Sequence, residues 1–520
     1  MRVALVLHGH LPWVRGHGTH PCGEEWLFQS WAETYLPLLD VLERLADDGG
    51  RDLLTLGLTP VMAEQMEDPA LLAAFHGWLA RRQLDLGHTV SRYGLSDLER
   101  LRPVWAAHWR RLRWLLARFE AGPLRTGLVA PLRALADAGV IELLGGPATH
   151  PYLPLAEQPE VMRAHLADGM ARSASVLGRR PAGVWTPECG YRPAGPVADP
   201  TVAPREHTAE GAPVLPRGTV ALPGLEELWS EAGAQHLVLD GPTLTGGWPR
   251  TGAARAPQAA TDHPVRVGES ELVAYGRNLD LAYAVWSPTG GYPGDPWYRD
   301  FHAIDLEGGF KSWRVTDHAS LAKEPYDPEA AHARVSAHAE DFLARCAAHR
   351  DRALSSADPG GEPPIAVVAL DAELLGHWWY EGPSWLESTL RRLRGDAALA
   401  TTTLQADRQR RDAPQRMDLP ESSWGAGKGH GAWVAPQTQA LWARLRAAER
   451  RWVDLPDGDA KTVAWRQLSL AAASDWPFLV VRDQSRRYAL ERVEGHLADF
   501  GAACEGRDLA TLTARDDPSA

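Results

Sequence analysis

Short hydrophobic runs alternate along the chain with longer segments in which apolar residues recur at helical spacing. Runs of this length are typical of strands buried on both faces. The predicted strands lie at residues 3–7, 53–58, 140–144, 183–185, 236–239, 272–275, 281–286 and 365–370. The predicted helices between them lie at residues 26–46, 62–81, 97–119, 157–177, 225–234 and 328–349. This alternation predicts an α/β fold with a parallel sheet covered by helices.

Two changes in the pattern predict the domain organisation of this 520-residue chain, which is too long for a single core. Residues 193–235 open with a stretch rich in Pro, Gly and Thr and are expected to form an inserted subdomain. It separates the first part of the α/β domain, 1–192, from the second part, 236–405, whose residues 246–269 form a loop. No strand is expected after about Gln405. Residues 406–520 are expected to form a C-terminal α-helical domain with a frayed polar tail after Arg507.

Two of the hydrophobic runs lead into carboxylates that stand among aromatic residues. Glu188 follows Trp185-Thr186-Pro187, and Asp371 follows residues 365–370. Cleavage of a glycosidic bond needs one protonated and one ionised carboxyl group, and aromatic rings offer flat apolar faces to sugars. A surface turn for Glu188 and a helix N-cap for Asp371 are the ordinary alternatives. Glu373 is a close competitor of Asp371, with His377 and Trp378 near it.

Further polar and aromatic residues stand where strands are expected to end. His8 and His10 share one face of the first strand, and with His150 and Asp371 they could hold a divalent metal or bind sugar hydroxyls; both interpretations stay open. Arg277 could orient a carboxylate, or form a surface ion pair of little worth. Tryptophans in settings opened by glycine or proline are either exposed sugar contacts or core residues: Trp286, Trp424, Trp433 and Trp476, the last beside Asp475.

The bulk composition narrows the class of partner. The formal net charge is −13, which disfavours nucleic acid. Apolar runs are too short for a signal peptide or a membrane helix, so a cytoplasmic location without membrane contact is expected. Four scattered cysteines form no metal-binding pattern, and no lysine ends an apolar strand in a way that suggests Schiff-base chemistry. The 22 tryptophans fit either core packing or a long sugar-binding groove.

Five segments together give the chain a specific resemblance to the family 57 glycoside hydrolases, and within them to bacterial 1,4-α-glucan branching enzymes. The resemblance covers almost the whole chain. The segments are His8-Gly9-His10-Leu11-Pro12, Ile141-Glu142-Leu143-Leu144, Trp185-Thr186-Pro187-Glu188, residues 369–378 and Ala473-Ser474-Asp475-Trp476-Pro477-Phe478.

The resemblance implies a distorted (β/α)7 barrel with an inserted subdomain and a C-terminal helical domain. It also implies a retaining mechanism without metal or other cofactor, in which Glu188 is the nucleophile and Asp371 the general acid/base. The substrate would be an α-1,4-glucan, whose transfer to a 6-hydroxyl creates α-1,6 branches as in glycogen synthesis; a monomer is expected. Substrate contacts are expected from His10, Arg277, Trp286, Gly294, Trp424 and Asp475, with His150 and Trp476 beside them.

One departure from the family pattern leaves alternatives open. Branching enzymes of this type carry a tyrosine on an active-site loop, whereas residues 246–269 are short and have no aromatic after Trp248. An α-amylase or a 4-α-glucanotransferase with little branching is therefore the alternative within the family. A metal-dependent hydrolase built on His8, His10 and Asp371, and a catalytically inactive glucan-binding protein, are the alternatives from other classes.

Overall fold

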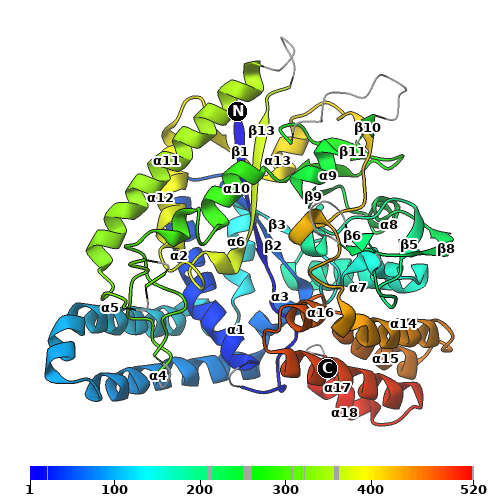
Figure 1. Cartoon of the computed structure of the whole chain (residues 1–520), viewed down its shortest axis with the longest axis horizontal. Coiled ribbons are helices and arrows are strands. Elements are labelled where there is room, and N and C mark those ends of the chain that lie inside the picture. Colours follow the sequence, from blue (N-terminus) through cyan, green and yellow to red (C-terminus); the bar gives the residue numbers. More distant parts are fainter. Residues whose placement is uncertain are drawn as a thin grey trace.

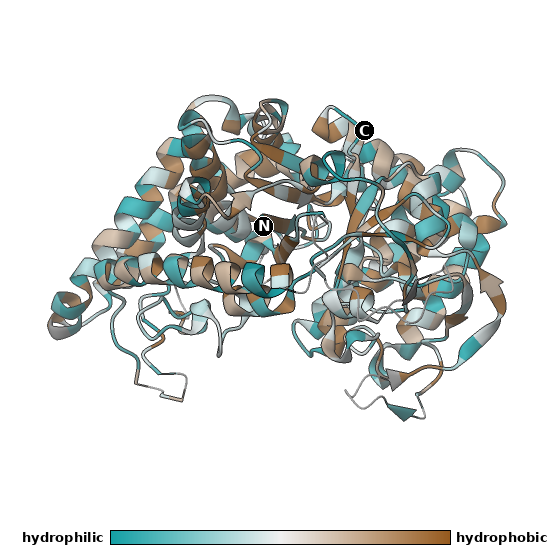
Figure 2. Ribbon diagram, turned by 90° about the horizontal axis from the view of Figure 1, so that it is seen from above, coloured by the Kyte–Doolittle hydropathy of each residue, from teal (hydrophilic) through white to brown (hydrophobic). Residues whose placement is uncertain are grey.

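A computed structural model of the chain places a ring of parallel strands at its centre, surrounded by helices (Figure 1). The described residues are 1–19, 22–204, 206–207, 213–246, 248–249, 261–305, 308–317, 319–320, 322–355 and 362–517. Viewed from above, hydrophobic residues gather on the central strands and hydrophilic residues on the outer turns of the helices (Figure 2).

Seven strands follow one another around the ring in chain order. They are β1 (Arg2–Gly9), β2 (Leu54–Leu58), β3 (Ile141–Leu144), β4 (Gly183–Trp185), β9 (His236–Leu239), β12 (Val273–Gly276) and β13 (Ile365–Asp371). Each neighbouring pair is parallel. Two joints consist of a single bridge each, Gly145 to Val184 between β3 and β4, and Arg277 to Val367 between β12 and β13. The expected distorted seven-stranded barrel is thus confirmed, and these two sparse joints are its distortion.

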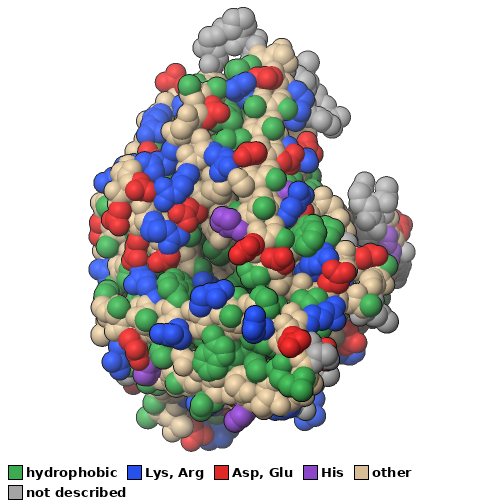
Figure 3. Space-filling view, turned by 90° about the vertical axis from the view of Figure 1, so that its left-hand side faces the viewer, with side chains coloured by type: hydrophobic (Ala, Val, Ile, Leu, Met, Phe, Trp, Pro, Cys, Tyr) green, Lys and Arg blue, Asp and Glu red, His purple; other side chains and the backbone are tan. Residues whose placement is uncertain are grey.

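Most of the helices that cover the barrel come between its strands, as the alternation predicts, and the last two follow β13. They are α1 (Glu24–Ser30) and α2 (Leu36–Asp47), joined by a π-helical turn at Trp31–Tyr35, then α3 (Pro60–Glu67), α4 (Pro69–Ser91), α5 (Leu95–Glu120), α6 (Val129–Asp137), α7 (Pro159–Leu177), α8 (Leu225–Glu231), α9 (Gly241–Thr245), α10 (Leu279–Trp286), α11 (Pro328–Ser355), α12 (Gly382–Gly395) and α13 (Leu404–Gln409). Helices α4 and α5 project to the left in Figure 1. On the face that this side presents, acidic and basic side chains are interspersed (Figure 3).

Alternation along β1 and β13 aims two polar side chains into the barrel. The interior faces of the two strands carry Ala4, Val6, Val367 and Ala369, which share one buried cluster. Because side chains alternate with a period of two, His8 and Asp371 come next on that face, and the strand register pairs them directly. Both stand at the carboxyl ends of their strands, where sites in such barrels are found.

The prediction of a strand at 281–286 is wrong, because this segment belongs to helix α10. Asn278 caps this helix by accepting a hydrogen bond from the backbone N–H of Leu281 at 3.1 Å. Leu281, Ala282 and Val285 are buried, which is a helical spacing, and the exposed side of the helix carries Tyr283 and Trp286. The mostly apolar run hid this period.

Strands do not end at Gln405 as expected. Strand β15 (Arg416–Asp418) pairs with β11 (Val265–Val267) and with β10 (Trp248–Pro249), extending the sheet that contains β12. It has only three residues, and Met417 alone is apolar, so no periodic pattern marks it. The predicted excursion over 193–235 holds an antiparallel pair, β5 (Gly195–Ala198) with β8 (Arg217–Leu222), next to α8.

The C-terminal region is helical and lies at the lower right of Figure 1. It contains α14 (Gln439–Val453), α15 (Asp459–Ala471), α16 (Asp475–Val481), α17 (Arg486–Cys504) and α18 (Leu509–Asp516). The prediction that the tail frays after Arg507 is wrong for residues 508–517, most of which form α18. Asp516 is fully buried and accepts hydrogen bonds from Trp13 at 3.2 Å and Gln467 at 2.8 Å. These contacts fix α18.

Candidate active site

The C-terminal helices meet the barrel at the carboxyl ends of its strands. Pro151, in the loop after β3, forms a bridge with Ala473, and the backbone N–H of Ser474 donates to the carbonyl of His150 at 2.9 Å. This junction places the start of α16, with Ser474 and Asp475, beside the residues that end β1, β4 and β13.

Glu188 lies just after β4 in a short 3₁₀ turn, Pro187–Cys189. Its φ of 62° is in the left-handed region, which a non-glycine residue occupies at a cost of about 1–3 kcal/mol. The Trp424 indole N–H donates to Oε2 at 2.7 Å and the Ser474 hydroxyl donates to Oε1 at 2.9 Å. Burial raises the pKa of Glu188 to about 7, while the two donors pull the pKa down and the charge of Asp475 adds to the rise.

Asp371 faces the same space from β13. Burial raises the pKa of Asp371 to about 7, and the negative charge of Glu188 adds to the rise. The positive charges of Arg277 and His10 oppose it. The two carboxyl groups therefore interact electrostatically across one partly accessible site. Among the described residues, two hydrogen-bond donors are aimed at the oxygens of Glu188, so Glu188 is the better candidate for the ionised partner and Asp371 for the protonated one.

Arg277 is held behind Asp371 by its own strand neighbours. Its Nε donates to the carbonyl of Ala369 at 2.9 Å, and Nη1 lies 3.7 Å from Asp240 Oδ1. Its guanidinium carbon lies 5.4 Å from the ring centre of Trp424. Asp240 is fully buried and also pairs with Lys428 at 2.7 Å. Because Asp240 is shared between two cations, the positive charge of Arg277 still acts on Asp371.

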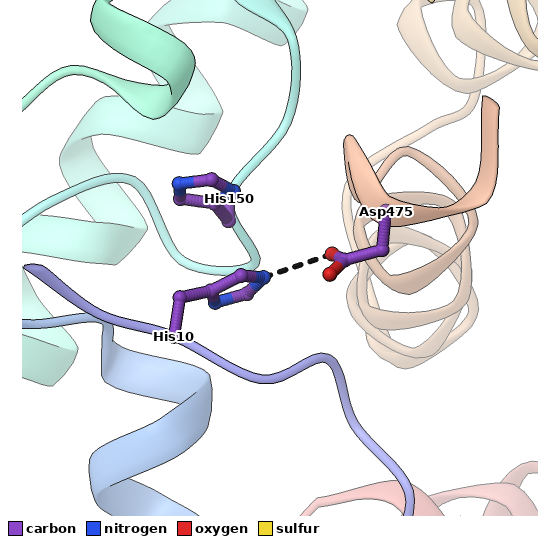
Figure 4. A group of neighbouring side chains, drawn as sticks. All are labelled: His10, His150 and Asp475. Atoms are coloured by element: carbon purple, nitrogen blue, oxygen red, sulfur yellow. Dashed lines mark hydrogen bonds and ion pairs between the residues drawn. The ribbon is translucent and has the colours of Figure 1, made fainter. Parts of the chain in front are cut away.

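The three histidines form a stack in the site. The rings of His10 and His150 lie 3.9 Å apart and nearly parallel, and the ring of His8 stacks on Trp185 at 4.5 Å. His10 Nε2 lies 2.8 Å from Asp475 Oδ2, the interaction drawn in Figure 4, and Nδ1 lies 2.9 Å from the hydroxyl of Thr59. His10 thus carries a carboxylate partner on one nitrogen and a hydroxyl on the other.

The ligand sets that could hold a metal differ from the expected one. Among the described residues, His10, His150 and Asp475 bring ligand atoms within 4.8 Å of one another, whereas the combination of His8, His10 and Asp371 does not form such a group. Both nitrogens of His10 and both of His150 already have hydrogen-bond partners, and their two rings stack face to face (Figure 4). Stacked rings do not aim nitrogen lone pairs at one shared point, so this donor set fits a metal poorly.

The competitor carboxylate Glu373 lies near Asp371 but has Tyr35 as its side-chain partner. The hydroxyl of Tyr35 donates to Glu373 Oε1 at 2.5 Å, and burial raises the pKa of Glu373 to about 8. His377 pairs instead with Glu33, at 2.7 Å. Lys311, His377 and Arg299 hold the pKa of Glu33 well below its usual range even though burial works against them. Glu33 and its three cationic neighbours therefore form an ionic cluster of their own. Glu373 is not part of that cluster, and the charge of Asp371 adds to the rise in the pKa of Glu373.

The expected substrate contacts separate into two groups. Beyond the residues at the carboxyl pair, Trp286 is 40% exposed at the end of α10 and Gly294 closes a 3₁₀ turn at Tyr292–Gly294. Trp476 is different, because it is fully buried in the helical core and its indole N–H donates to the carbonyl of Leu470 at 2.9 Å. The expectation that Trp476 contacts substrate is therefore not supported by its position. Trp433 is likewise buried, stacked on Tyr152 at 4.1 Å.

Two residues at this site could not be identified from the sequence pattern. Ser474 lies in the Ala473–Phe478 motif, but the motif alone does not show that its hydroxyl contacts Glu188. Tyr283 is 41% exposed, with its ring centre 5.9 Å from the guanidinium carbon of Arg277 and 6.0 Å from Lys428 Nζ. The prediction of a strand at 281–286 does not place Tyr283 beside Trp286, because residues three apart share a face in a helix but not in a strand. Half of the loop predicted at 246–269, namely 250–260 together with Gly247, lies outside the described residues, as does the side chain of Trp248.

Comparisons with known proteins agree with one another. A family model described as glycosyl hydrolase family 57 matches residues 4–420, and one described as 1,4-alpha-glucan branching enzyme, C-terminal, matches residues 443–513. A probable 1,4-alpha-glucan branching enzyme of Mycobacterium tuberculosis is 37% identical over 519 residues, covering 95% of this chain and 89% of the relative. A 1,4-alpha-glucan branching enzyme of Thermococcus kodakarensis is 32% identical over 525 residues, covering 96% and 72%.

The solved structures include close matches of the whole fold. The crystal structure of a GH57-type branching enzyme from Pyrococcus horikoshii superposes with a TM-score of 0.87 at 30% identity, covering 99% of this chain and 94% of that chain. An α-amylase from Thermotoga maritima superposes with a TM-score of 0.78 at 24% identity, which speaks for the fold alone. In the part of the chain that the structure describes, no helix is both long and apolar enough to cross a membrane.

Proposed function

This chain belongs to glycoside hydrolase family 57, and from that premise and the geometry of the site we propose that it is a retaining transglycosylase that branches α-1,4-glucans. It cleaves an α-1,4 bond and transfers the released chain to a glucan 6-hydroxyl, which creates an α-1,6 branch. The match of residues 443–513 to a branching-enzyme C-terminal model supports branching in particular.

The observation that carries the proposal is the pair of carboxyl groups with unequal surroundings. Glu188 receives two hydrogen bonds that favour its ionised form, and it acts as the nucleophile. Asp371 is kept protonated by burial and by the charge of Glu188, and it acts as the general acid. Two carboxyl groups whose environments separate their roles are what retaining glycoside chemistry requires.

The reaction then has two steps. The proton of Asp371 passes to the glycosidic oxygen as Glu188 attacks the anomeric carbon, so the C–O bond breaks and a glycosyl ester forms on Glu188. The fragment bearing the new 4-hydroxyl leaves. A 6-hydroxyl of a second glucan gives its proton to Asp371 and attacks the same carbon, which breaks the ester and restores both groups. Water in place of the 6-hydroxyl would give hydrolysis.

The surrounding residues bind the sugar. His10, fixed by Thr59 and Asp475, offers an oriented imidazole beside Asp371, with His150 stacked behind it. Trp424 and Trp286 offer rings on which sugar C–H groups pack. Contacts from Arg277, Asp475 and Gly294 are part of the same proposal.

The experiment combines one substitution with analysis of the product. Glu188→Gln should abolish turnover of amylose, while wild-type protein should generate new α-1,6 signals in the proton NMR spectrum of the product. Glu449→Gln is the matched control, because Glu449 is also a buried glutamate whose pKa burial raises to about 7, yet it lies in α14. This control should keep its activity.

Each other outcome contradicts part of the proposal. Substantial activity in Glu188→Gln would remove Glu188 from the mechanism. Shortened or redistributed α-1,4 chains without α-1,6 signals would replace branching by hydrolysis or 4-α-glucan transfer. Loss of activity to a chelator would favour a metal-dependent reaction. The cytoplasmic location, the monomeric state and the domain limits 1–192, 193–235, 236–405 and 406–520 stay predictions.

A further inference from the structure

Ser474 has a hydroxyl that does not serve its own helix. The residue occupies the N-cap position of α16, where a serine side chain ordinarily accepts a hydrogen bond from a backbone N–H of the first turn. Here the side chain makes no such bond. The buried hydroxyl lies instead 2.9 Å from Glu188 Oε1 and 2.9 Å from His150 Nδ1. The Ser474 hydroxyl therefore contacts the active site instead of capping its own helix.

The hydrogen-bond chain continues beyond His150. His150 Nε2 lies 2.9 Å from His8 Nε2, and both rings are buried. The other nitrogen of His8, Nδ1, is buried and has no hydrogen-bond partner among the described residues. Burial, and next the charge of His10, lowers the pKa of both imidazoles well below the usual range. Each ring therefore carries one N–H and one lone pair, so the bonds between them have a direction.

Two directions are available, and they differ in cost. In the first, His8 Nε2–H donates to His150, His150 Nδ1–H donates to the Ser474 hydroxyl, and the hydroxyl donates to Glu188. In the second, every bond is reversed, so that the hydroxyl donates to His150 and the Glu188 carboxylate loses a donor. The reversed chain also places the hydrogen of His8 on Nδ1, as a buried N–H without an acceptor. Buried unpaired N–H groups are costly and rarer than unpaired acceptors. The first direction is the stable one.

We propose that Ser474 is a positioning residue for the nucleophile, and that His150 and His8 fix the direction in which its hydroxyl donates to Glu188. The inference rests on the proposed role of Glu188. Protonation of Glu188 at Oε1 would either leave the Ser474 hydroxyl hydrogen without its acceptor or reverse all three bonds and leave the buried N–H on His8. Both outcomes are costly, so the hydrogen-bond chain resists that protonation and holds the carboxylate in one orientation.

Other groups around Glu188 also affect its pKa, in addition to the hydrogen-bond chain of His8, His150 and Ser474. Trp424 donates to Oε2, and the charge of Asp475 opposes ionisation. Asp371 is the protonated partner of Glu188 in the pair. The charge of Glu188 raises the pKa of Asp371, and also that of Cys189 and Tyr152. Because the two imidazoles are neutral, the chain stabilises Glu188 through a directed hydrogen bond rather than through positive charge.

The test removes and restores the hydroxyl. Ser474→Ala should move the acidic limb of the kcat/KM profile on an α-glucan to higher pH by about 1–2 units, because the nucleophile loses one donor. Ser474→Thr keeps a hydroxyl and should restore most of the wild-type limb. Ser469→Ala is the matched control, since Ser469 is also buried and its hydroxyl donates to the carbonyl of Arg466 in α15. This control should leave the limb in place.

A second variant tests the direction at a distance. His8→Phe keeps an aromatic ring against Trp185 but removes the terminal donor, which frees His150 to take the other tautomer. It should move the limb in the same direction as Ser474→Ala by a smaller amount, although His8 has no hydrogen bond to Glu188. Equal loss of kcat/KM at every pH in Ser474→Ala, with the limb unmoved, would reduce Ser474 to a structural role and overturn the inference.

A spectroscopic readout separates this inference from the proposed function. The infrared band of the protonated Glu188 carboxyl, identified by its loss in Glu188→Gln, gives the pKa of that group without substrate. A higher pKa in Ser474→Ala supports the chain whether or not the wild-type protein branches glucan. An unchanged pKa in a protein that does branch glucan overturns the inference alone.

Discussion

Replacing Glu188 by glutamine should change the proton affinity of the partner carboxyl, Asp371. In the unmodified site the charge of Glu188 helps to raise the pKa of Asp371 to about 7. Glutamine has nearly the same shape and no charge, so it imitates the glycosyl ester that forms in the first step. The pKa of Asp371 should therefore fall in the Glu188→Gln variant, as it must during catalysis when the acid becomes the base of the second step.

The size of the fall follows from the electrostatics of the pair. At the separation of about 5.5 Å that retaining chemistry requires, and an effective dielectric constant near 20, two unit charges interact by about 3 kcal/mol, or about 2 pKa units. Burial, the largest cause of the rise, remains in the variant, and so does the opposing charge of Arg277. We expect a fall of about 1–2 units, which leaves the pKa of Asp371 above its ordinary value.

Infrared difference titration measures this directly. The protonated carboxyl band of Asp371 is identified by its loss when Asp371→Asn is added to Glu188→Gln. For the unmodified protein, the alkaline limb of kcat/KM reports the same group with Glu188 ionised. An Asp371 that titrates in Glu188→Gln at or above the pH of that limb would refute the coupling, and with it the assignment of the two roles.

Three further predictions address other parts of the site. Trp424→Phe removes the donor 2.7 Å from Glu188 Oε2 and should move the acidic limb of kcat/KM to higher pH by about 1–2 units; a limb that stays in place would show that this bond does not tune the nucleophile. Asp371→Asn should stabilise the fold at pH 8, on the order of 1–2 kcal/mol in urea unfolding, and give no gain at pH 3. The raised folded-state pKa means that the native protein binds more protons than the unfolded chain between about pH 4 and 7, so stability falls as pH rises through this window; equal gains at both pH values would contradict that linkage. Tyr283→Ala should lower kcat/KM on amylose roughly 2- to 10-fold, through loss of an exposed ring at the site, whereas Trp109→Ala, on the projecting helix α5, should not; equal effects would remove Tyr283 from the substrate path.

The barrel strands could be predicted because each is buried on both faces and therefore appears as a mostly apolar run. The same property caused the error at 281–286, where a helix packed on one side happens to have apolar or aromatic residues on its exposed side as well. Strand β15 and helix α18 escaped prediction for another reason. They are fixed by contacts with distant segments, as in the bonds of Asp516 to Trp13 and Gln467, and no local pattern records such contacts.

The candidate site could be predicted where a residue follows a barrel strand, as Glu188 and Asp371 do. Period-two alternation places His8 on the interior face. Its hydrogen-bond partner His150 lies in the loop after β3, so the pattern of β1 alone does not reveal this bond. Ser474 lies 286 positions from Glu188, so only the docking of α16 on the barrel brings them together. Trp476, two residues on, faces the helical core, and a Trp-Pro sequence does not show which way the ring points.

The covalent intermediate offers the most direct test of the central claim, that Glu188 and Asp371 act on one sugar in two successive roles. The protein would be incubated with an α-maltosyl fluoride that carries fluorine at C5 of the reacting sugar, and its peptides analysed by mass spectrometry. Asp371→Ala should accumulate more of the adduct, because the second step then lacks its base while fluoride leaves without an acid. We predict a maltosyl ester on the peptide that contains Glu188, absent in Glu188→Gln. An adduct on Asp475, Glu373 or another carboxylate, or turnover of α-glucan with no adduct under any of these conditions, would contradict the account.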